Sequence, residues 1–190
     1  MSQVKSLRKM FQIKIVLKGS KPPVWRRILL PNDTSLDKLH EIIQITMGWT
    51  DTHLHQFICN EDYYAIPDDE FMTETKDERG VKLSTFLKRE KDHILYEYDF
   101  GDDWLHEVIL EKVMPDEGKT TIYCLKGVGA CPPEDCGGLP GYYHMLEVLS
   151  NENNPEYEDI IEWLGEEFDA NYFPLAETNE ILDKYVNKKN

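Results

Sequence analysis

The segment at residues 94–111, ILYEYDFGDDWLHEVILE, carries acids, an indole and an imidazole around a turn of the kind that joins two strands. A loop over residues 100–103 predicts that Asp99 pairs with Trp104 and Glu97 with His106, all on one face. Such a set suits proton transfer or the holding of a cation. The structural alternative is a Glu97–His106 ion pair beside a tight acidic turn. A shift of one residue in register would separate the set.

The segment GACPPEDCGG at residues 129–138 is the second candidate. Its Pro-Pro pair fixes φ, and its Gly-Gly pair permits the positive φ of a sharp reversal. We interpret it as a stiff bend that presents Glu134 and Asp135. We therefore predict a site for a ligand or partner of unknown identity between the Asp99–His106 hairpin and the Glu134–Gly138 loop. The residues predicted to form it are Trp25, Arg26, Glu97, Asp99, Gly101, Asp102, Trp104, His106, Pro133, Glu134, Asp135, Gly137, Gly138 and Tyr142.

Zinc binding is a further interpretation of the cysteines. Cys124, Cys131 and Cys136 with His106 or His144 would supply thiolates and one imidazole, which suit a tetrahedral structural site. The cysteines are separated by six and four residues, which is wider than in compact zinc motifs. Cys136 with either histidine would also be a nucleophile and base pair. The sequence does not decide between these uses and simple burial.

A harder cation such as magnesium would prefer oxygen ligands from Asp102, Glu134 or Asp135. With His106 as a further group and Cys136 nearby, these residues define an alternative function, a metal-dependent hydrolase. No organic cofactor is predicted, so a divalent metal, zinc or magnesium, is the cofactor that the sequence allows.

Two shorter patterns have both a chemical and a structural interpretation. HLH places His53 and His55 on one face of a strand, where they would chelate a metal or be buried against aromatic neighbours. PPVWRRILLP places Trp25 beside Arg26 and Arg27, which would clamp a phosphate or carboxylate or pair with the acids of the chain. We favour the structural interpretation of both patterns.

Together with MGWTDTHLHQF, CLKGVGACPPEDCGGLPGYYHML and EFDANYF, these segments resemble, in order, the signature blocks of the plasmid pRiA4b ORF-3-like family. The resemblance implies a group found in bacteria and archaea and on plasmids and mobile elements, with some members labelled passenger or resolvase-like proteins. It assigns no reaction, and this chain lacks the basic DNA-binding domain of a resolvase. The signature positions are Trp25, Arg26, Trp49, His53, Asp99, Gly101, Asp102, Trp104, His106, Pro133, Glu134, Asp135, Gly137, Gly138, Gly141 and Tyr142.

These residues must be positioned by an α+β fold. Alternating apolar residues predict strands at 11–17 and 24–30, and a helix follows between Ser35 and Gly48. Short strands are expected within 53–66, an exposed loop at 67–80, a helical turn at 82–90, the hairpin at 93–113, and a strand at 120–125. We predict a mixed, mostly antiparallel sheet with a β-grasp-like N-terminal half and a packed helix. The chain is expected to be one domain, with a core at 1–138 and a C-terminal helical cap at 139–190.

Composition and charge limit the partners. The chain of 190 residues has a net charge of −15, although eight basic residues and no acid lie in its first 30 residues. We do not expect non-specific nucleic-acid binding, because it draws on neutralised phosphates. Local nucleic-acid contact through the basic N-terminal 30 residues remains a further alternative. With neither a signal-peptide pattern nor an apolar run of membrane-spanning length, we expect a cytoplasmic protein, with reduced cysteines and no membrane partner.

Overall fold

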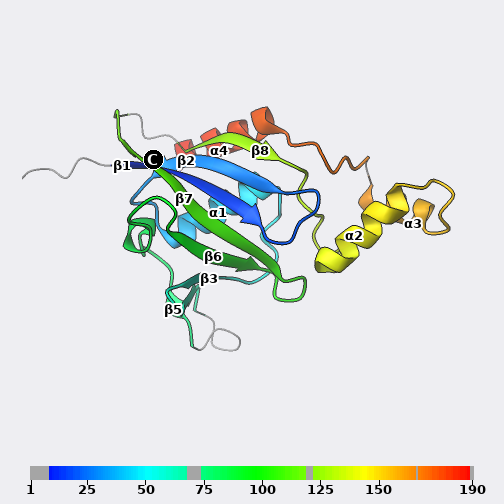
Figure 1. Ribbon diagram of the computed structural model, residues 1–190, viewed down its shortest axis with the longest axis horizontal. Coiled ribbons are helices and arrows are strands. Elements are labelled where there is room, and N and C mark those ends of the chain that lie inside the picture. Colours follow the sequence, from blue (N-terminus) through cyan, green and yellow to red (C-terminus); the bar gives the residue numbers. More distant parts are fainter. Residues whose placement is uncertain (1–8, 68–73, 119–121, 166, 189–190) are drawn as a thin grey trace, which may run out of the picture.

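The computed structural model describes residues 9–67, 74–118, 122–165 and 167–188, which form an eight-stranded sheet and four α-helices (Figure 1). The sheet order is β5-β4-β3-β6-β7-β1-β2-β8, and every pairing is antiparallel except that of β4 with β5. The predicted α+β class and mixed, mostly antiparallel sheet are confirmed. The strands are β1 Lys9–Leu17, β2 Trp25–Pro31, β3 His55–Cys59, β4 Asp62–Ala65, β5 Lys76–Asp77, β6 His93–Tyr98, β7 Trp104–Pro115 and β8 Tyr123–Val128.

The helices are α1 Leu36–Met47, α2 Gly138–Leu149, α3 Tyr157–Leu164 and α4 Leu175–Lys188, and a short 3₁₀ turn covers Leu83–Thr85. Helix α1 has the predicted limits, since Ser35 precedes it in extended conformation and Gly48 ends it with φ 95°. Helices α1 and α4 lie over the same side of the sheet, whereas α2 and α3 lie beyond one end of it (Figure 1). In the described part of the chain, no helix is both long enough and apolar enough to cross a bilayer.

The core fills the layer between α1 and one face of the sheet. Ile13, Ile15 and Ile28 of the central strands are fully buried, as are Leu39 and Ile43 of α1. The alternation of β1 and β2 follows the period of two that the sequence predicted, with the intervening residues half-buried on the open face. The helix and the sheet therefore share one apolar interface.

The register predicted for the β6–β7 hairpin is wrong by one residue. Tyr98 pairs with Trp104 and Tyr96 with His106, because the connecting loop includes Asp99, whose carbonyl accepts a hydrogen bond from the Asp103 amide at 2.7 Å. Trp104 and His106 consequently face the core together with both tyrosines. Glu97 lies on the opposite face, where its carboxylate accepts a 2.6 Å hydrogen bond from Gln56. The predicted four-residue polar face does not exist.

The segment at 67–80 is not the wholly exposed loop that we expected, although residues 68–73 lie outside the described residues. Lys76 and Asp77 form β5, parallel to β4. The next residue, Glu78, is fully buried and holds the Nε2 atom of His55 at 3.1 Å from both of its carboxylate oxygens. Glu78 therefore fixes the segment to the edge of the sheet that β5 forms.

Helix α4 lies against β8, the strand at the opposite edge of the sheet. The Asn179 side chain accepts a hydrogen bond from the backbone amide of Cys124 at 2.8 Å and donates one to the Cys124 carbonyl at 3.0 Å. The amide side chain thus binds the strand backbone as a further strand would. This contact ties the C-terminal helix to the sheet.

Candidate functional site

The hairpin turn and the Glu134–Gly138 loop lie in contact, as the prediction of a shared site requires. The Gly137 amide donates a hydrogen bond to Oδ2 of Asp102 at 3.2 Å. Gly138 packs so closely that an added Cβ would lie 2.5 Å from the Asp102 carbonyl oxygen, and its φ is +66°. The two glycines therefore allow the loop to approach the hairpin backbone.

Glu134 anchors this loop and is not a free ligand. Its carboxylate accepts hydrogen bonds from the Thr50 amide at 3.0 Å and from the hydroxyls of Thr50 and Tyr98. Burial opposes ionisation of Glu134, but the hydrogen bonds from Thr50 and Tyr98 outweigh it and lower the carboxyl pKa. Burial and the Glu134 hydrogen bond together raise the pKa of Tyr98. The contact is thus a neutral phenol donating to a carboxylate.

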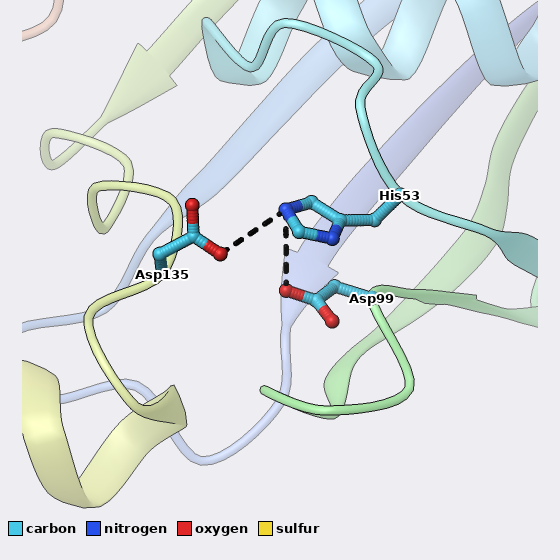
Figure 2. A group of neighbouring side chains, drawn as sticks. All are labelled: His53, Asp99 and Asp135. Atoms are coloured by element: carbon cyan, nitrogen blue, oxygen red, sulfur yellow. Dashed lines mark ion pairs between the residues drawn. The ribbon is translucent and has the colours of Figure 1, made fainter.

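Three other side chains converge beside this anchor, namely His53, Asp99 and Asp135 (Figure 2). The Nε2 atom of His53 lies 3.3 Å from Oδ1 of Asp135 and 3.7 Å from Oδ2 of Asp99. They come from three segments: the connection before β3, the β6–β7 turn and the loop before α2. Asp99 and Asp135 belong to the predicted site, whereas His53 enters it from the HLH motif.

The backbone aims both carboxylates at the histidine. Asp99 and Asp135 have left-handed backbone conformations, with φ of 58° and 59°, which aspartate tolerates better than most residues. One carboxylate oxygen of Asp99 accepts the Gly101 amide at 3.0 Å and the Asp102 amide at 3.4 Å. The other oxygen is the one that faces His53. The Asp99 side chain is 10% exposed and that of Asp135 is 74% exposed, so the cluster opens to solvent on the Asp135 side.

The spacing of these atoms fits a divalent metal ion. Two ligands at about 2.0–2.2 Å from a tetrahedral zinc ion lie about 3.4 Å apart, and the corresponding separation for octahedral magnesium is about 3.0 Å. The observed 3.3 and 3.7 Å are closer to the zinc value. Although His53 Nε2 faces both carboxylates, it makes no hydrogen bond within the described residues. One imidazole and two carboxylates would leave a fourth position open.

Within the described residues, the cysteine-based zinc site does not form. The sulfur atoms of Cys124, Cys131 and Cys136 do not gather with His106 or His144 at the spacing of metal ligands. Burial raises the thiol pKa of Cys124 to about 11 and of Cys136 to about 12, and raises that of Cys131 as well. His144 instead pairs with Glu156 at 3.0 Å on the surface. These thiols are neutral at pH 7, so Cys136 is not an activated nucleophile.

Other predicted site residues lie in two different places. Trp25 is on the open face of the sheet, where the cations of Lys14, Arg27 and Lys126 lie 4.6, 5.2 and 6.0 Å from its ring. Arg26 points to the opposite, buried face. Nucleic-acid contact through the N-terminal residues stays a prediction, and residues 1–8 lie outside the described residues.

Pro133 lines a cavity beside the loop, Gly101 lies in the hairpin turn, and Tyr142 is fully buried in α2. The Tyr142 hydroxyl has no hydrogen-bond partner among the described residues, and its ring meets Phe168 edge-on at 6.3 Å. Tyr142 therefore packs α2 against the C-terminal segment and does not contact the His53 cluster through any described polar atom.

His106 is a core residue, and neither the acid or base interpretation nor the alternative ion pair with Glu97 applies to it. It is fully buried, and its ring contacts those of Trp49 at 5.3 Å and Tyr96 at 5.6 Å. Burial lowers its pKa from 6.5 to about 4, so the imidazole is neutral at pH 7.

This buried imidazole makes stability depend on pH. The unfolded chain binds a proton at His106 below about pH 6.5 and the folded chain does not, so stability is lost as pH falls through that value. We expect His106 to account for a loss of about 2 kcal/mol between pH 7 and pH 5. Urea unfolding of the wild type and His106→Phe at both pH values measures the difference. An equal loss in both proteins would show that His106 is not the cause.

The sequence did not predict that His53 lies beside Asp99 and Asp135, because these residues are distant from it along the chain. The HLH pattern suggested that His53 and His55 act together, but His55 turns to Glu78 whereas His53 turns to Asp99 and Asp135. The sequence offered one signal, because His53, Asp99 and Asp135 are all among the signature positions. Only the fold shows that the three meet.

The comparisons with known proteins identify the family. The pattern of the family described as plasmid pRiA4b ORF-3-like protein matches residues 9–177. An uncharacterized protein of Sinorhizobium fredii, y4hQ, is 32% identical over 179 residues, which cover 93% of this chain and 92% of the relative. The crystal structure of a protein of unknown function from Methanosarcina mazei Go1 is 38% identical, with a TM-score of 0.80, and the match covers 90% of this chain and 98% of that one. The chain therefore belongs to the plasmid pRiA4b ORF-3-like protein family.

Proposed function

We propose that the protein is a cytoplasmic binding module built around a divalent metal ion, which His53, Asp99 and Asp135 hold between the β6–β7 turn and the loop before α2. The observation that carries this proposal is the position of His53 Nε2, 3.3 Å from one carboxylate and 3.7 Å from the other. Zinc is the metal we favour, because these distances match tetrahedral ligands and imidazole with carboxylate is a common zinc ligand set. The family description names a plasmid, and we include an accessory role on plasmids or mobile elements in the proposal.

The open side of the cluster supports ligand binding at the metal. Three protein ligands leave a fourth position, which water or an oxygen atom of a ligand would occupy. Asp135 provides the solvent-facing ligand, since its side chain is largely exposed, whereas Asp99 is held from behind by the turn amides. A ligand would approach from the Asp135 side and replace the water.

The test is metal binding to purified protein that has first been stripped with a chelator. We expect zinc to bind at one site and to raise the melting temperature, because a ligand that binds only the folded state stabilises it. Cobalt in the same site should give the intense visible absorption of tetrahedral coordination. Asp135→Asn should weaken zinc binding by about 100-fold or more, since loss of a mere supporting contact already costs 10–100-fold.

Asp103→Asn is the matched control. It removes the same charge from the same part of the surface, and asparagine suits its backbone φ of 55° as well as aspartate does. Asp103 does not belong to the cluster and should bind zinc like the wild type. A wild-type protein that neither binds zinc or cobalt nor gains stability from them would refute the metal centre, as would equal effects of the two variants.

The same geometry supports a second candidate function, metal-dependent hydrolysis. Catalytic zinc sites keep three protein ligands and an open position, where a bound water becomes a nucleophile near neutral pH. The observation that favours it is the solvent-facing side of the cluster at Asp135. Chromogenic phosphate and carboxylate esters, tested with zinc and manganese, should be hydrolysed by wild type and Asp103→Asn but not by Asp135→Asn. No turnover by zinc-loaded wild type would leave the binding module as the function.

A further inference from the structure

Arg26 is a cation buried in the interior, with only 1% of its surface exposed. A buried charge is expected to have a partner of opposite charge, because its transfer from water is costly. Among the described residues, no aspartate or glutamate forms an ion pair or a hydrogen bond with this guanidinium. Its charge therefore lacks the usual compensation.

Backbone carbonyls accept hydrogen bonds from three of the five N–H groups of the guanidinium. Nε donates to the Thr46 carbonyl at 2.7 Å, near the C-terminal end of α1, where the helix dipole favours a cation. Nη1 donates to the carbonyls of Trp25 and Val128, both at 3.0 Å. These bonds use Nε and both hydrogens of Nη1, so they leave the two hydrogens of Nη2 for another acceptor.

The titratable groups that interact electrostatically with Arg26 do not supply a negative charge. They are the thiols of Cys131 and Cys124, and burial raises the pKa of both, that of Cys124 to about 11. Burial also lowers the pKa of Arg26 itself, as expected for a cation that its surroundings compensate only in part. The neutral thiols leave one positive charge in this region.

A cavity of about 400 Å³ lies against Arg26 and has aromatic walls. Trp49, Phe168, Tyr172 and Phe173 line it, and the Phe173 ring centre lies 4.0 Å from the guanidinium carbon. The volume is within the range of sites for small molecules, which combine apolar walls with a few polar groups.

The C-terminal segment that forms this wall is fixed in place by close backbone packing. The Ala130 amide donates to the Ala170 carbonyl at 3.0 Å, and an added Cβ at Gly127 would lie 2.3 Å from the Phe173 ring. The EFDANYF signature block thus has a structural task, which is to close the cavity over Arg26.

The acids that line the cavity limit the charge of a ligand. Glu167 and Asp169 are exposed, and Glu134 is engaged by Thr50 and Tyr98. Three acids would repel a dianion such as a phosphate monoester more strongly than a monoanion. The two remaining donors of Nη2 suit a carboxylate.

We propose that this cavity binds a small monocarboxylic acid with an apolar, preferably aromatic body, whose carboxylate pairs with Nη2 of Arg26 while its body packs against Trp49 and Phe168. This site is separate from the proposed metal centre and does not depend on it.

The test compares benzoate and phenylacetate with their neutral amides, all in the presence of a chelator so that binding to a metal ion is excluded. Tryptophan fluorescence, to which Trp49 beside the cavity contributes, and the melting temperature report binding. We expect each acid to bind at least tenfold more tightly than its amide, and Arg26→Met to abolish this preference. Arg27→Met is the control, because Arg27 lies on the opposite face of the sheet and pairs with Glu111.

A measurement on the wild type keeps the test valid if Arg26→Met does not fold. The chain has five arginines, so their side-chain nitrogen resonances can be resolved and that of Arg26 should shift with benzoate and not with benzamide. Absence of acid binding up to about 20 mM, which is weaker than any useful affinity, would overturn the proposal. Equal binding of acid and amide, or an unchanged preference in folded Arg26→Met, would overturn it too.

Discussion

Replacing Gly138 by alanine is expected to lower the free energy of unfolding by about 3 kcal/mol, compared with about 1 kcal/mol for the same replacement at Gly137. Both glycines have positive φ, +66° at Gly138 and +88° at Gly137, so both variants have the cost of a left-handed alanine. They differ in surroundings. At Gly138 the new Cβ would lie 2.5 Å from the Asp102 carbonyl oxygen, whereas at Gly137 the nearest atom is 3.7 Å away.

The difference between the two variants thus measures how tightly the loop rests on the hairpin. Urea unfolding of both proteins gives the two free energies, with unchanged m values as evidence that the unfolding transition is the same. Because the displaced loop carries Asp135, Gly138→Ala should also weaken zinc binding, whereas Gly137→Ala should leave it close to wild type. Similar losses of stability in the two variants would mean that the loop shifts to admit the new Cβ and that the Gly138–Asp102 contact does not stabilise the protein.

Glu78→Ala is expected to destabilise the protein by about 3–5 kcal/mol, because it removes one partner of a buried pair and leaves the other without compensation. Glu78 is fully buried, and both of its oxygens lie 3.1 Å from His55 Nε2. The loss should reach further than this pair. The His55 ring stacks on that of His40 at 3.5 Å, and His40 in turn bonds Tyr96 and Asp51, each at 2.8 Å.

Asp77→Ala is the control for this experiment. Asp77 is the preceding residue and pairs with Arg79, but both side chains are exposed, so its removal should change stability far less. The double variant His55→Phe with Glu78→Leu should recover most of the loss, since apolar replacement of a whole buried pair is often tolerated. Chemical unfolding of the four proteins tests this. A small loss for Glu78→Ala would show that water replaces the Glu78 carboxylate as the hydrogen-bond partner of His55.

The sequence predicted those parts of the fold that depend on local signals. The limits of α1 are set by Ser35 and Gly48, and the strands near it by simple alternation, so neighbouring residues contain the necessary information. The β6–β7 register failed because the loop extends back to Asp99, whose left-handed conformation is not evident from the letters DFGDD. One additional loop residue turned β7 over relative to β6, so that His106 lies in the core with Tyr96 and Tyr98.

The contact between the two candidate segments was predicted correctly, but the arrangement of their side chains was not. The Pro-Pro and Gly-Gly pairs correctly indicated a bend that meets the hairpin, and Asp99 and Asp135 were among the residues named. Which acid anchors the loop and which one faces outward depends on Thr50 and Tyr98, both more than 30 residues from Glu134 along the chain. These contacts between residues distant in sequence depend on how the whole chain folds. No pattern within either segment predicts them.

The side chain of Asn179 has a consequence for self-association. An outermost strand with free amides and carbonyls is a template on which a second molecule can add its own strand, which is how many β-proteins aggregate. At Cys124, the second residue of β8, both backbone groups already form hydrogen bonds with one asparagine side chain from α4. The C-terminal helix α4 thereby hinders extension of the sheet by a second molecule. Truncation of the chain before this helix would expose the backbone groups of β8 and promote aggregation.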